Sequence, residues 1–135
     1  MMRRKVPSAA LFRYVFDASS LINIERHGLI PKLKQLKDMV LMPKKVADEI
    51  DQPNSPLSRF IHSCPEVVTD LMDGEDQEYL RVRRQPGIDD GEAAVIAVAI
   101  RRHLPVVIDD AKGKAKAESH GIQTLRWTDF FAKKS

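Results

Sequence analysis

The sequence has a single cysteine, Cys64, together with one tryptophan and two tyrosines among its 135 residues. One thiol cannot form an intramolecular disulfide or a thiolate metal cluster. The longest uninterrupted apolar run, residues 93–100, is far short of the roughly 20 residues that a membrane helix needs. The basic N-terminus is not followed by the apolar stretch of a signal peptide. These absences predict a soluble cytoplasmic protein without membrane contact.

Other familiar site signatures are absent as well. The four histidines show no paired spacing of the kind that zinc ligands have. The dipeptide at 113–114 lacks the Gly-x-x-x-x-Gly-Lys-Ser/Thr spacing of a phosphate-binding loop. No repeat or Gly/Ser linker divides the chain. We therefore expect one domain over residues 1–135, with a core at about 14–131 and a basic N-terminal extension at 1–13.

The charges nearly cancel, but they are segregated along the chain. There are 22 Lys and Arg against 19 Asp and Glu, a formal net charge of +3. Residues 1–14 carry four basic groups and no acid, whereas residues 70–92 carry eight acids and three arginines. A net charge this small supports contact with nucleic acid only weakly, so the positions of the charges carry more information than their sum.

Short apolar runs alternate with helical patterns over the whole length. The runs predict strands at 13–16, 39–42, 66–69 (an edge strand), 105–108 and 122–125. The clearest helix is expected from Asp89 or Asp90 to His103, and because it is apolar on all sides it should be buried. Other helices are expected after a cap at Ser19 or Ser20, at 73–84, and after a cap at Thr128. Alternation of this kind predicts an α/β fold, a three-layer α/β/α sandwich with a central parallel sheet of four to five strands.

Acidic residues follow the predicted strands. Asp17 ends the first, and the pair at 109–110 ends the fourth. Ligands of open parallel sheets bind outside the carboxyl ends of the strands, and Glu49 and Glu92 lie in helices that start at the same edge. So many carboxylates in a small volume would repel one another unless a cation were present, and carboxylate oxygens suit Mg²⁺ or Mn²⁺.

Four segments resemble the motifs of PIN-domain nucleases, in the order of that family. Residues 15–22, VFDASSLI, resemble the first motif, and residues 43–50, PKKVADEI, resemble the second. Residues 89–97, DDGEAAVIA, are similar to the third motif in its Gly-Glu form, and residues 106–110, VVIDD, to the fourth. The resemblance covers about residues 14–131 and implies a PIN-like fold.

The resemblance also implies roles for individual residues. It implies hydrolysis of RNA phosphodiester bonds with one or two Mg²⁺ or Mn²⁺ ions. The implied catalytic residues are Asp17, Glu49, Glu92 and Asp110, and the implied metal ligands are Asp17, Glu92, Asp109 and Asp110. Ser19, Asp89 and Asp90 would orient these acids or a metal-bound water without binding the metal themselves. Where many members have an acid in the third motif, this chain has Ala93, and the Thr or Ser before the last acids is Ile108, so Asp109 and Asp110 both remain open as the primary ligand.

Cations near the same edge are expected to contact the RNA phosphates. These are Lys44, Lys45, Lys112, Lys114 and Lys116. The aromatic residues of the last helix, Trp127, Phe130 and Phe131, are expected to pack in the core rather than to stack on bases.

Small members of the family are frequently toxins of toxin–antitoxin pairs, which implies a VapC-like toxin with a small antitoxin partner and a homodimer. Three alternatives stay open. One is a receiver-type phosphoacceptor domain, although receivers have an acidic pair after the first strand and a single Asp later, the reverse of the order found here. The others are a catalytically silent PIN-like domain that only binds a partner, and a DNA-cleaving relative.

Overall fold

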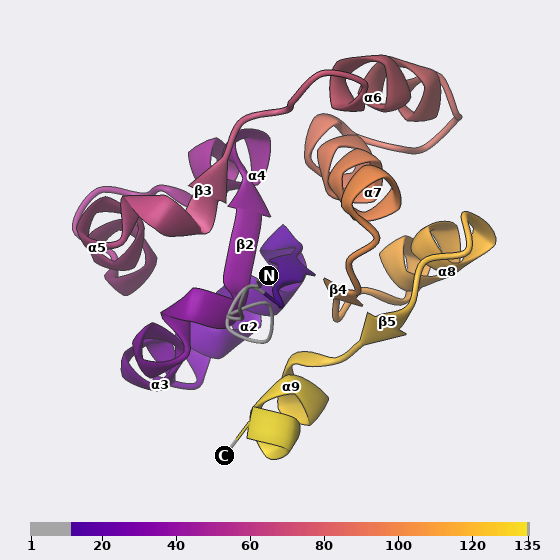
Figure 1. Ribbon diagram of the computed structural model, residues 1–135. Helices are drawn as coiled ribbons and strands as arrows, with labels where there is room; N and C mark the ends of the chain where they lie inside the picture. Colours follow the sequence, from indigo (N-terminus) through magenta and orange to yellow (C-terminus); the bar gives the residue numbers. More distant parts are fainter. Residues whose placement is uncertain (1–11, 135) are drawn as a thin grey trace, which may run out of the picture.

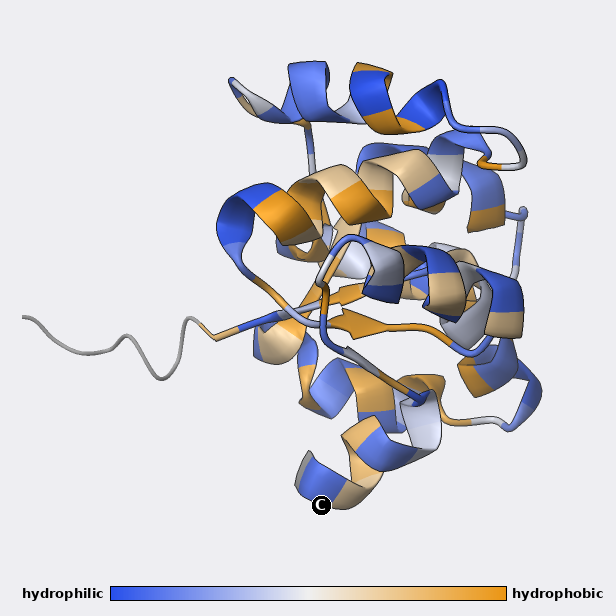
Figure 2. Cartoon of the chain, turned by 90° about the vertical axis from the view of Figure 1, so that its right-hand side faces the viewer, coloured by the Kyte–Doolittle hydropathy of each residue, from blue (hydrophilic) through white to orange (hydrophobic). Residues whose placement is uncertain are grey.

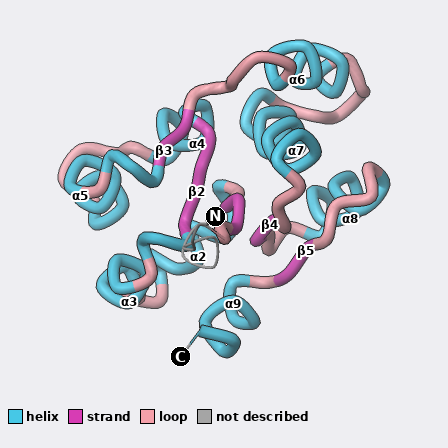
Figure 3. The backbone as a smooth tube through the Cα atoms, viewed as in Figure 1, coloured by secondary structure: helices cyan, strands magenta, loops and turns pink. Residues whose placement is uncertain are grey.

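The computed structural model describes residues 12–134, so nearly all of the predicted basic extension at 1–13 lies outside the described residues. Within the described range, five strands form one parallel sheet in the order β3-β2-β1-β4-β5 (Figures 1 and 3). The strands are β1 (Tyr14–Phe16), β2 (Val40–Pro43), β3 (Val68–Thr69), β4 (Val106–Val107) and β5 (Thr124–Leu125). The predicted parallel sheet and the edge position of its third strand are confirmed.

Helices cover both faces of this sheet. They are α2 (Ala18–Arg26), α3 (Ile30–Gln35), α4 (Lys44–Ile50), α5 (Pro56–Ser63), α6 (Glu75–Arg83), α7 (Asp90–Arg102), α8 (Ala111–Ser119) and α9 (Trp127–Lys134), with short 3₁₀ turns η1 (Lys37–Met39) and η2 (Pro65–Val67). Figure 1 shows α6, α7 and α8 on one side and α3, α5 and α9 on the other. The three-layer α/β/α sandwich is confirmed.

The core lies between the strands and the helices that pack directly on them. Every residue of β1, β2 and β4 is buried, and so is the run from Ala93 to Ala99 in α7. Figure 2 shows hydrophobic colour concentrated in the strands and in α7, whereas the outer helix α6 is mostly hydrophilic. A helix buried on all sides is expected to be apolar all round, which explains the composition of α7.

Helix ends differ in detail from the expectation. The side chain of Asp17, and not that of Ser19 or Ser20, caps α2 by accepting a hydrogen bond from the Ser19 N–H. α9 begins at Trp127, so Thr128 lies inside the helix instead of capping it. The predicted packing role of the last aromatic residues is confirmed for Phe130 and Phe131, which are buried, while Trp127 is partly buried against the core.

The strand order separates this fold from receiver domains. Receivers have the flavodoxin-like order 2-1-3-4-5. Here β1 lies between β2 and β4, and the order is 3-2-1-4-5. The receiver-type alternative is therefore wrong, because the first strand lies here between the second and the fourth, whereas in a receiver it lies between the second and the third. In the part of the chain that the structure describes, none of the helices is both long enough and apolar enough to cross a membrane.

A buried ion pair fastens the outer helix α6 to α7. The carboxylate of Glu75 is 3% exposed and accepts hydrogen bonds from Arg102 Nε at 2.7 Å and Nη2 at 2.9 Å. The Met72 N–H donates to the same carboxylate at 2.8 Å. Burial by itself raises the pKa of Glu75, but the bonds from Arg102 and Met72 outweigh it and hold the pKa below its usual value.

Replacing Glu75 with alanine should lower the free energy of unfolding by about 2 kcal/mol or more, because Arg102, whose side chain is only 22% exposed, loses its charged partner. Urea denaturation measures the loss. Asp76→Ala is the matched control, since Asp76 is exposed in the same first turn of α6 and should cost less than about 0.5 kcal/mol. Equal losses in the two variants would contradict a structural role for the Glu75–Arg102 pair.

Candidate active site at the carboxyl edge of the sheet

The candidate site begins where β1 ends. Asp17 follows Phe16 directly, and its N–H donates to the Val107 carbonyl of β4 at 3.1 Å, which fixes its backbone to the neighbouring strand. The hydroxyl of Ser20, fully buried, donates toward the carbonyls of Asp17 at 2.8 Å and Val107 at 3.0 Å. The sheet thus holds Asp17 at its carboxyl edge through two adjacent strands.

A small cavity of about 270 Å³ opens beside Asp17. Four parts of the fold supply its lining: the β1–α2 junction with the start of α2, α4, the start of α7 and the cap of α8. The residues are Asp17, Ala18, Ser19, Ile22, Val46, Glu49, Asp89, Gly91, Glu92 and Asp110. All four predicted catalytic acids therefore meet at one place, although they lie more than 90 residues apart in sequence at the extremes.

Asp17 is the most buried of these acids, at 8% exposure. Ser19 donates to it twice, from its hydroxyl to Oδ2 at 2.7 Å and from its N–H to Oδ1 at 3.1 Å. Burial raises the pKa of the Asp17 carboxyl, the two bonds from Ser19 oppose this, and the neighbouring charges of Glu92 and Asp110 raise it further. The net shift is upward, so the site disfavours the bare negative charge.

Glu49 reaches the cavity from α4, which packs against α7. Burial is the main cause that raises the pKa of its carboxyl, followed by the charges of Asp89 and Asp17. Gly91 makes this approach possible, because a Cβ at that position would lie 2.6 Å from Glu49 Oε1. Gly91 of the third motif therefore leaves room for the carboxylate of Glu49 from the second motif.

Glu92 forms a capping box with Asp89 at the start of α7. Its N–H donates to Asp89 Oδ1 at 2.8 Å, and its Oε1 accepts from the Asp89 N–H at 3.2 Å. This confirms the predicted helix start, with Asp89 as the cap and Asp90 as the first helical residue. The same Oε1 lies 3.7 Å from Lys116 Nζ, and Lys116 also donates to the Gly87 carbonyl. Helix capping thus fixes Glu92 at the cavity wall.

Asp110 caps α8 by accepting a hydrogen bond from the Gly113 N–H at 2.8 Å. A Cβ on Gly113 would lie 2.6 Å from the Ile108 side chain, 3.2 Å from Asp110 Oδ2 and 3.4 Å from Glu92 Oε2. The bare backbone of Gly113 therefore lets two carboxylates lie close to it. Capping and a site role are compatible for Asp110, since one carboxylate serves both.

Two predicted site residues lie elsewhere. Asp109 does not line the cavity, and its carboxylate instead accepts hydrogen bonds from Asn23 and from Arg126. Asp90 accepts from Tyr79 at 3.0 Å and from Arg83 at 2.5 Å, and Arg83 is the main cause that lowers its pKa. Both carboxylates are drawn away by basic or amide donors from neighbouring elements, which the sequence spacing does not reveal.

The five lysines expected to contact RNA are not equally placed. Only Lys116 lines a small pocket together with Asp17 and Glu92. Lys45 lies 4.9 Å from the centre of the Tyr79 ring and lines a neighbouring cavity of about 500 Å³ with Glu49 and Asp89. The remaining three are exposed, Lys44 paired with Asp48 at 3.1 Å, Lys114 paired with Glu118 at 3.3 Å, and Lys112 without an ion pair among residues 12–134.

The cavity fits a hard divalent cation in its donor chemistry. It gathers carboxylates, and the pKa values of Asp17 and Glu49 are raised by burial first and by the neighbouring acids in addition, while Gly91 and Gly113 leave the room that a Cβ would fill. In the described residues, no three His, Cys, Asp or Glu side chains already converge as a ready metal cage. Mg²⁺ commonly takes only one or two direct carboxylates and keeps several waters, so it does not require such a cage.

Replacing Gly91 with alanine should displace the Glu49 carboxylate without harming the fold, because the clash is with the end of a flexible side chain. Helix propensity favours alanine by up to about 1 kcal/mol, so the melting temperature should stay level or rise. Hydrolytic activity should fall about ten- to a hundredfold, the usual effect of a misplaced site group. A nuclease assay and a thermal unfolding measurement test this. Unchanged activity would mean that the position of Glu49 does not matter for the reaction.

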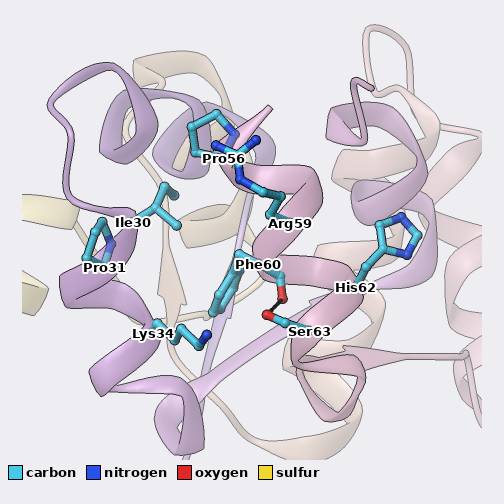
Figure 4. Close-up of a pocket in the computed structure, with 8 residues that line it drawn as sticks. All are labelled: Ile30, Pro31, Lys34, Pro56, Arg59, Phe60, His62 and Ser63. Atoms are coloured by element: carbon cyan, nitrogen blue, oxygen red, sulfur yellow. Dashed lines mark hydrogen bonds between the residues drawn. The ribbon is translucent and has the colours of Figure 1, made fainter. Parts of the chain in front are cut away.

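Sequence reasoning missed Asn23 and Arg126. Asn23 lies one helical turn after Ser19 in α2, and Arg126 follows the last strand directly, so both stand at the same edge of the sheet as Asp17. These positions, one turn into the first helix and directly after the last strand, are the sequence signals that point to the two residues. A larger cavity of about 730 Å³ lies apart, between α3 and α5, lined by residues such as Pro31, Arg59 and Phe60 (Figure 4), and holds none of the predicted site residues.

Comparison with known proteins identifies the family of the chain. A family model described as PIN domain matches residues 13–127, which include every acid of the cavity. The crystal structure of PAE2754 from Pyrobaculum aerophilum is similar in fold, with a TM-score of 0.61 and 19% identity over 90% of this chain and 96% of that one. No curated protein sequence matches the chain. On the family match over most of its length, the chain belongs to the PIN-domain family.

Proposed function

We propose that this protein is a divalent-metal-dependent endoribonuclease, which hydrolyses RNA phosphodiester bonds with Mg²⁺ or Mn²⁺. The observation that carries the proposal is the convergence of Asp17, Glu49, Glu92 and Asp110 on one cavity at the carboxyl edge of the sheet. Membership of a family of nuclease type supports the reaction class. The choice of RNA rests on the resemblance of the motifs and on the cations along the same edge.

In this proposal Asp17, Glu92 and Asp110 would hold one or two cations, which would supply charge stabilisation at the phosphate and would lower the pKa of a bound water. Ser19 orients Asp17 through its two hydrogen bonds. Glu49 is suited to accept a proton from the attacking water, because it lines the same cavity as Asp17, and burial and the neighbouring acids raise its pKa, which makes its carboxylate a stronger base.

Lys116 is the lysine best placed to meet a phosphate at this cavity. Its ammonium group is held by the Gly87 carbonyl and lies 3.7 Å from Glu92 Oε1, at the wall of the pocket that also contains Asp17. Lys45 lies on the other flank, beyond Glu49. A substrate strand that passes between these two cations would bring one phosphate to the acids.

The test is a cleavage assay of matched RNA and single-stranded DNA with Mn²⁺, Mg²⁺ or EDTA. We expect RNA cleavage with either metal and none with EDTA. Cleavage of DNA alone would favour the DNA-cleaving alternative, and absence of any cleavage by protein that binds Mn²⁺ would favour the catalytically silent one.

As a finer proposal, which rests on family resemblance, the protein is the VapC-like toxin of a toxin–antitoxin pair and works in the cytoplasm, as a homodimer that a small antitoxin inhibits. A short gene for a small DNA-binding protein beside this one would support it. Expression of the chain alone should then arrest growth, and co-expression of the neighbour should restore it. A gene without such a neighbour would count against the toxin role.

A further inference from the structure

Arg126 is an exposed cation at the candidate catalytic edge. It follows β5 directly, and β5 is parallel to β4, so Arg126 lies at the same edge of the sheet as the acids. Its Nε donates to Asp109 Oδ1 at 3.0 Å. The Arg126 side chain is 62% exposed, whereas that of Asp109 is only 12% exposed. A largely buried carboxylate thus holds one edge of an outward-facing guanidinium.

Asp109 is itself held by two elements, α2 and the β5–α9 turn. Its Oδ2 accepts a hydrogen bond from Asn23 of α2, and its Oδ1 accepts from Arg126 in the β5–α9 turn. Its N–H donates to Ser19 Oγ at 3.3 Å, and the same hydroxyl donates to Asp17 Oδ2 at 2.7 Å. Asp109 and Ser19 therefore form a continuous hydrogen-bonded link from Arg126 to Asp17.

This arrangement leaves Asp109 poorly suited to bind a metal ion. Both of its oxygens already accept hydrogen bonds, one of them from a cation, and the residue does not line the cavity that contains Asp17 and Asp110. A ligating carboxylate needs an oxygen lone pair directed at the ion. The contacts of Asp109 serve instead to fix the position of Arg126.

The two Nη groups of Arg126 have no hydrogen-bond partner within residues 12–134, although Nε is engaged. A guanidinium held in this way presents a planar pair of donors that matches two phosphate oxygens, and less rotamer freedom is lost when it binds. The guanidinium also lies at the edge of the sheet that carries the acids, but it does not line their cavity. It is thus suited to a phosphate next to the one at the acids.

We propose that Arg126 binds a backbone phosphate of the RNA strand flanking the cleavage position, and that Asp109 is the positioning residue that holds it there. The proposal rests on the proposed ribonuclease function. It assigns to Asp109 a role other than the metal ligation that the family motif implies, and it adds a strand contact on the side of the cavity away from Lys45.

The test measures binding of a labelled single-stranded RNA by fluorescence anisotropy at several salt concentrations, in an Asp17→Asn background that prevents cleavage. Arg126→Gln should weaken binding about five- to tenfold and reduce the salt slope by about 0.7, the value for one phosphate contact on a single strand. Asp109→Asn should weaken binding similarly, and the double variant should bind no more weakly than Arg126→Gln.

The matched control is Arg59→Gln, which removes the same charge from an exposed arginine of α5 in the separate cavity of Figure 4. Its binding and salt slope should equal those of the parent. A second readout is calorimetric titration with Mn²⁺ in the chain without the Asp17 change. Asp109→Asn should keep the Mn²⁺ affinity within about twofold, whereas Asp110→Asn should lower it by about tenfold or more.

Three outcomes would overturn the inference. If Arg126→Gln has the same RNA affinity and salt slope as Arg59→Gln, Arg126 makes no contact with a phosphate. Asp109→Asn could lose Mn²⁺ as Asp110→Asn does, which makes Asp109 a ligand after all. Failure of the parent protein to bind RNA would overturn the proposed function and this inference together, whereas RNA binding that the Arg126 change leaves unaltered overturns the inference alone.

Discussion

Replacing Asp17 with asparagine is expected to reduce RNA cleavage by at least about a hundredfold while the protein stays folded. Asp17 is the acid that the sheet holds most firmly, and on the proposed mechanism its charge is needed for the cation. Loss of one group that stabilises charge in a transition state typically costs about 10²–10³ in turnover. Initial rates with saturating Mn²⁺ measure the effect.

The fold should tolerate this change for reasons visible in the structure. Asparagine caps a helix about as well as aspartate, so the bond from the Ser19 N–H at the start of α2 can persist. Burial and the charges of Glu92 and Asp110 oppose the carboxylate, so removing its charge offsets any lost bond from the Ser19 hydroxyl. The free energy of unfolding without metal should stay within about 1 kcal/mol of the parent.

Asp38→Asn is a suitable control for the Asp17 variant. The Asp38 side chain is 81% exposed and lies in η1, before β2 and so at the amino end of the sheet. It should cleave at the parental rate. Undiminished cleavage by Asp17→Asn would mean that the reaction takes place elsewhere on the protein.

Mn²⁺ should stabilise the folded protein strongly, because the cavity gathers negative charges that lack enough cationic partners. At a free concentration of about 100 times the dissociation constant, a ligand that binds only the folded state adds about 2.7 kcal/mol to the free energy of unfolding. Denaturation with Mn²⁺ and with EDTA measures the difference. Glu92→Gln should lose most of it, while Asp38→Asn should keep it.

The carboxyl groups of the cavity also give the stability of the metal-free fold a defined pH dependence. Burial is the main cause that raises the pKa of Asp17 above its usual 3.8, and of Glu49 above its usual 4.5. The folded protein then binds more protons than the unfolded chain between the raised and the usual values, so without metal these two groups stabilise the fold increasingly as the pH falls through that window. The gain is lost as the pH rises through the folded pKa values.

Protons and Mn²⁺ compete for these carboxylates, so the stabilisation by Mn²⁺ should shrink as the pH falls through the same window. The difference between the parent and Asp17→Asn isolates this contribution from groups with lowered pKa values, such as Glu75. An Mn²⁺ effect of equal size in the parent and in Asp17→Asn, at every pH, would show that the metal binds at another place.

Much of the architecture could be predicted from local patterns. The apolar runs ending at Phe16 and Val107 and the all-round apolar helix α7 are features of residues near in sequence, so they identify elements and their alternation. The helix cap after β1 was harder to assign. The pattern offered Ser19 or Ser20 as the cap of α2, whereas the extended backbone angles of Asp17 and its bond from the Ser19 N–H make Asp17 the cap.

The acids show the same division. Their positions after strands or at helix starts predicted that Asp17, Glu49, Glu92 and the pair at 109–110 would meet, because parallel strands share a carboxyl edge, and the structure brings all of them except Asp109 to one cavity. Asp109 and Asp110 cannot be told apart by position, since they are adjacent and of one type. They differ because Asn23 and Arg126, which are distant in sequence, donate hydrogen bonds to Asp109. Asp110 instead accepts a hydrogen bond from the Gly113 N–H.

The sequence by itself determined the fold class, the order of its elements and a set of five acids at one edge of the sheet, because periodicity and strand ends are local properties. The tertiary structure decided the partner of each charge. Asp90 is held by Arg83, Asp109 by Arg126, and Glu49 is seated on the bare backbone of Gly91. Such contacts depend on how helices pack across the sheet at a few ångströms, a quantity that no spacing along the chain encodes.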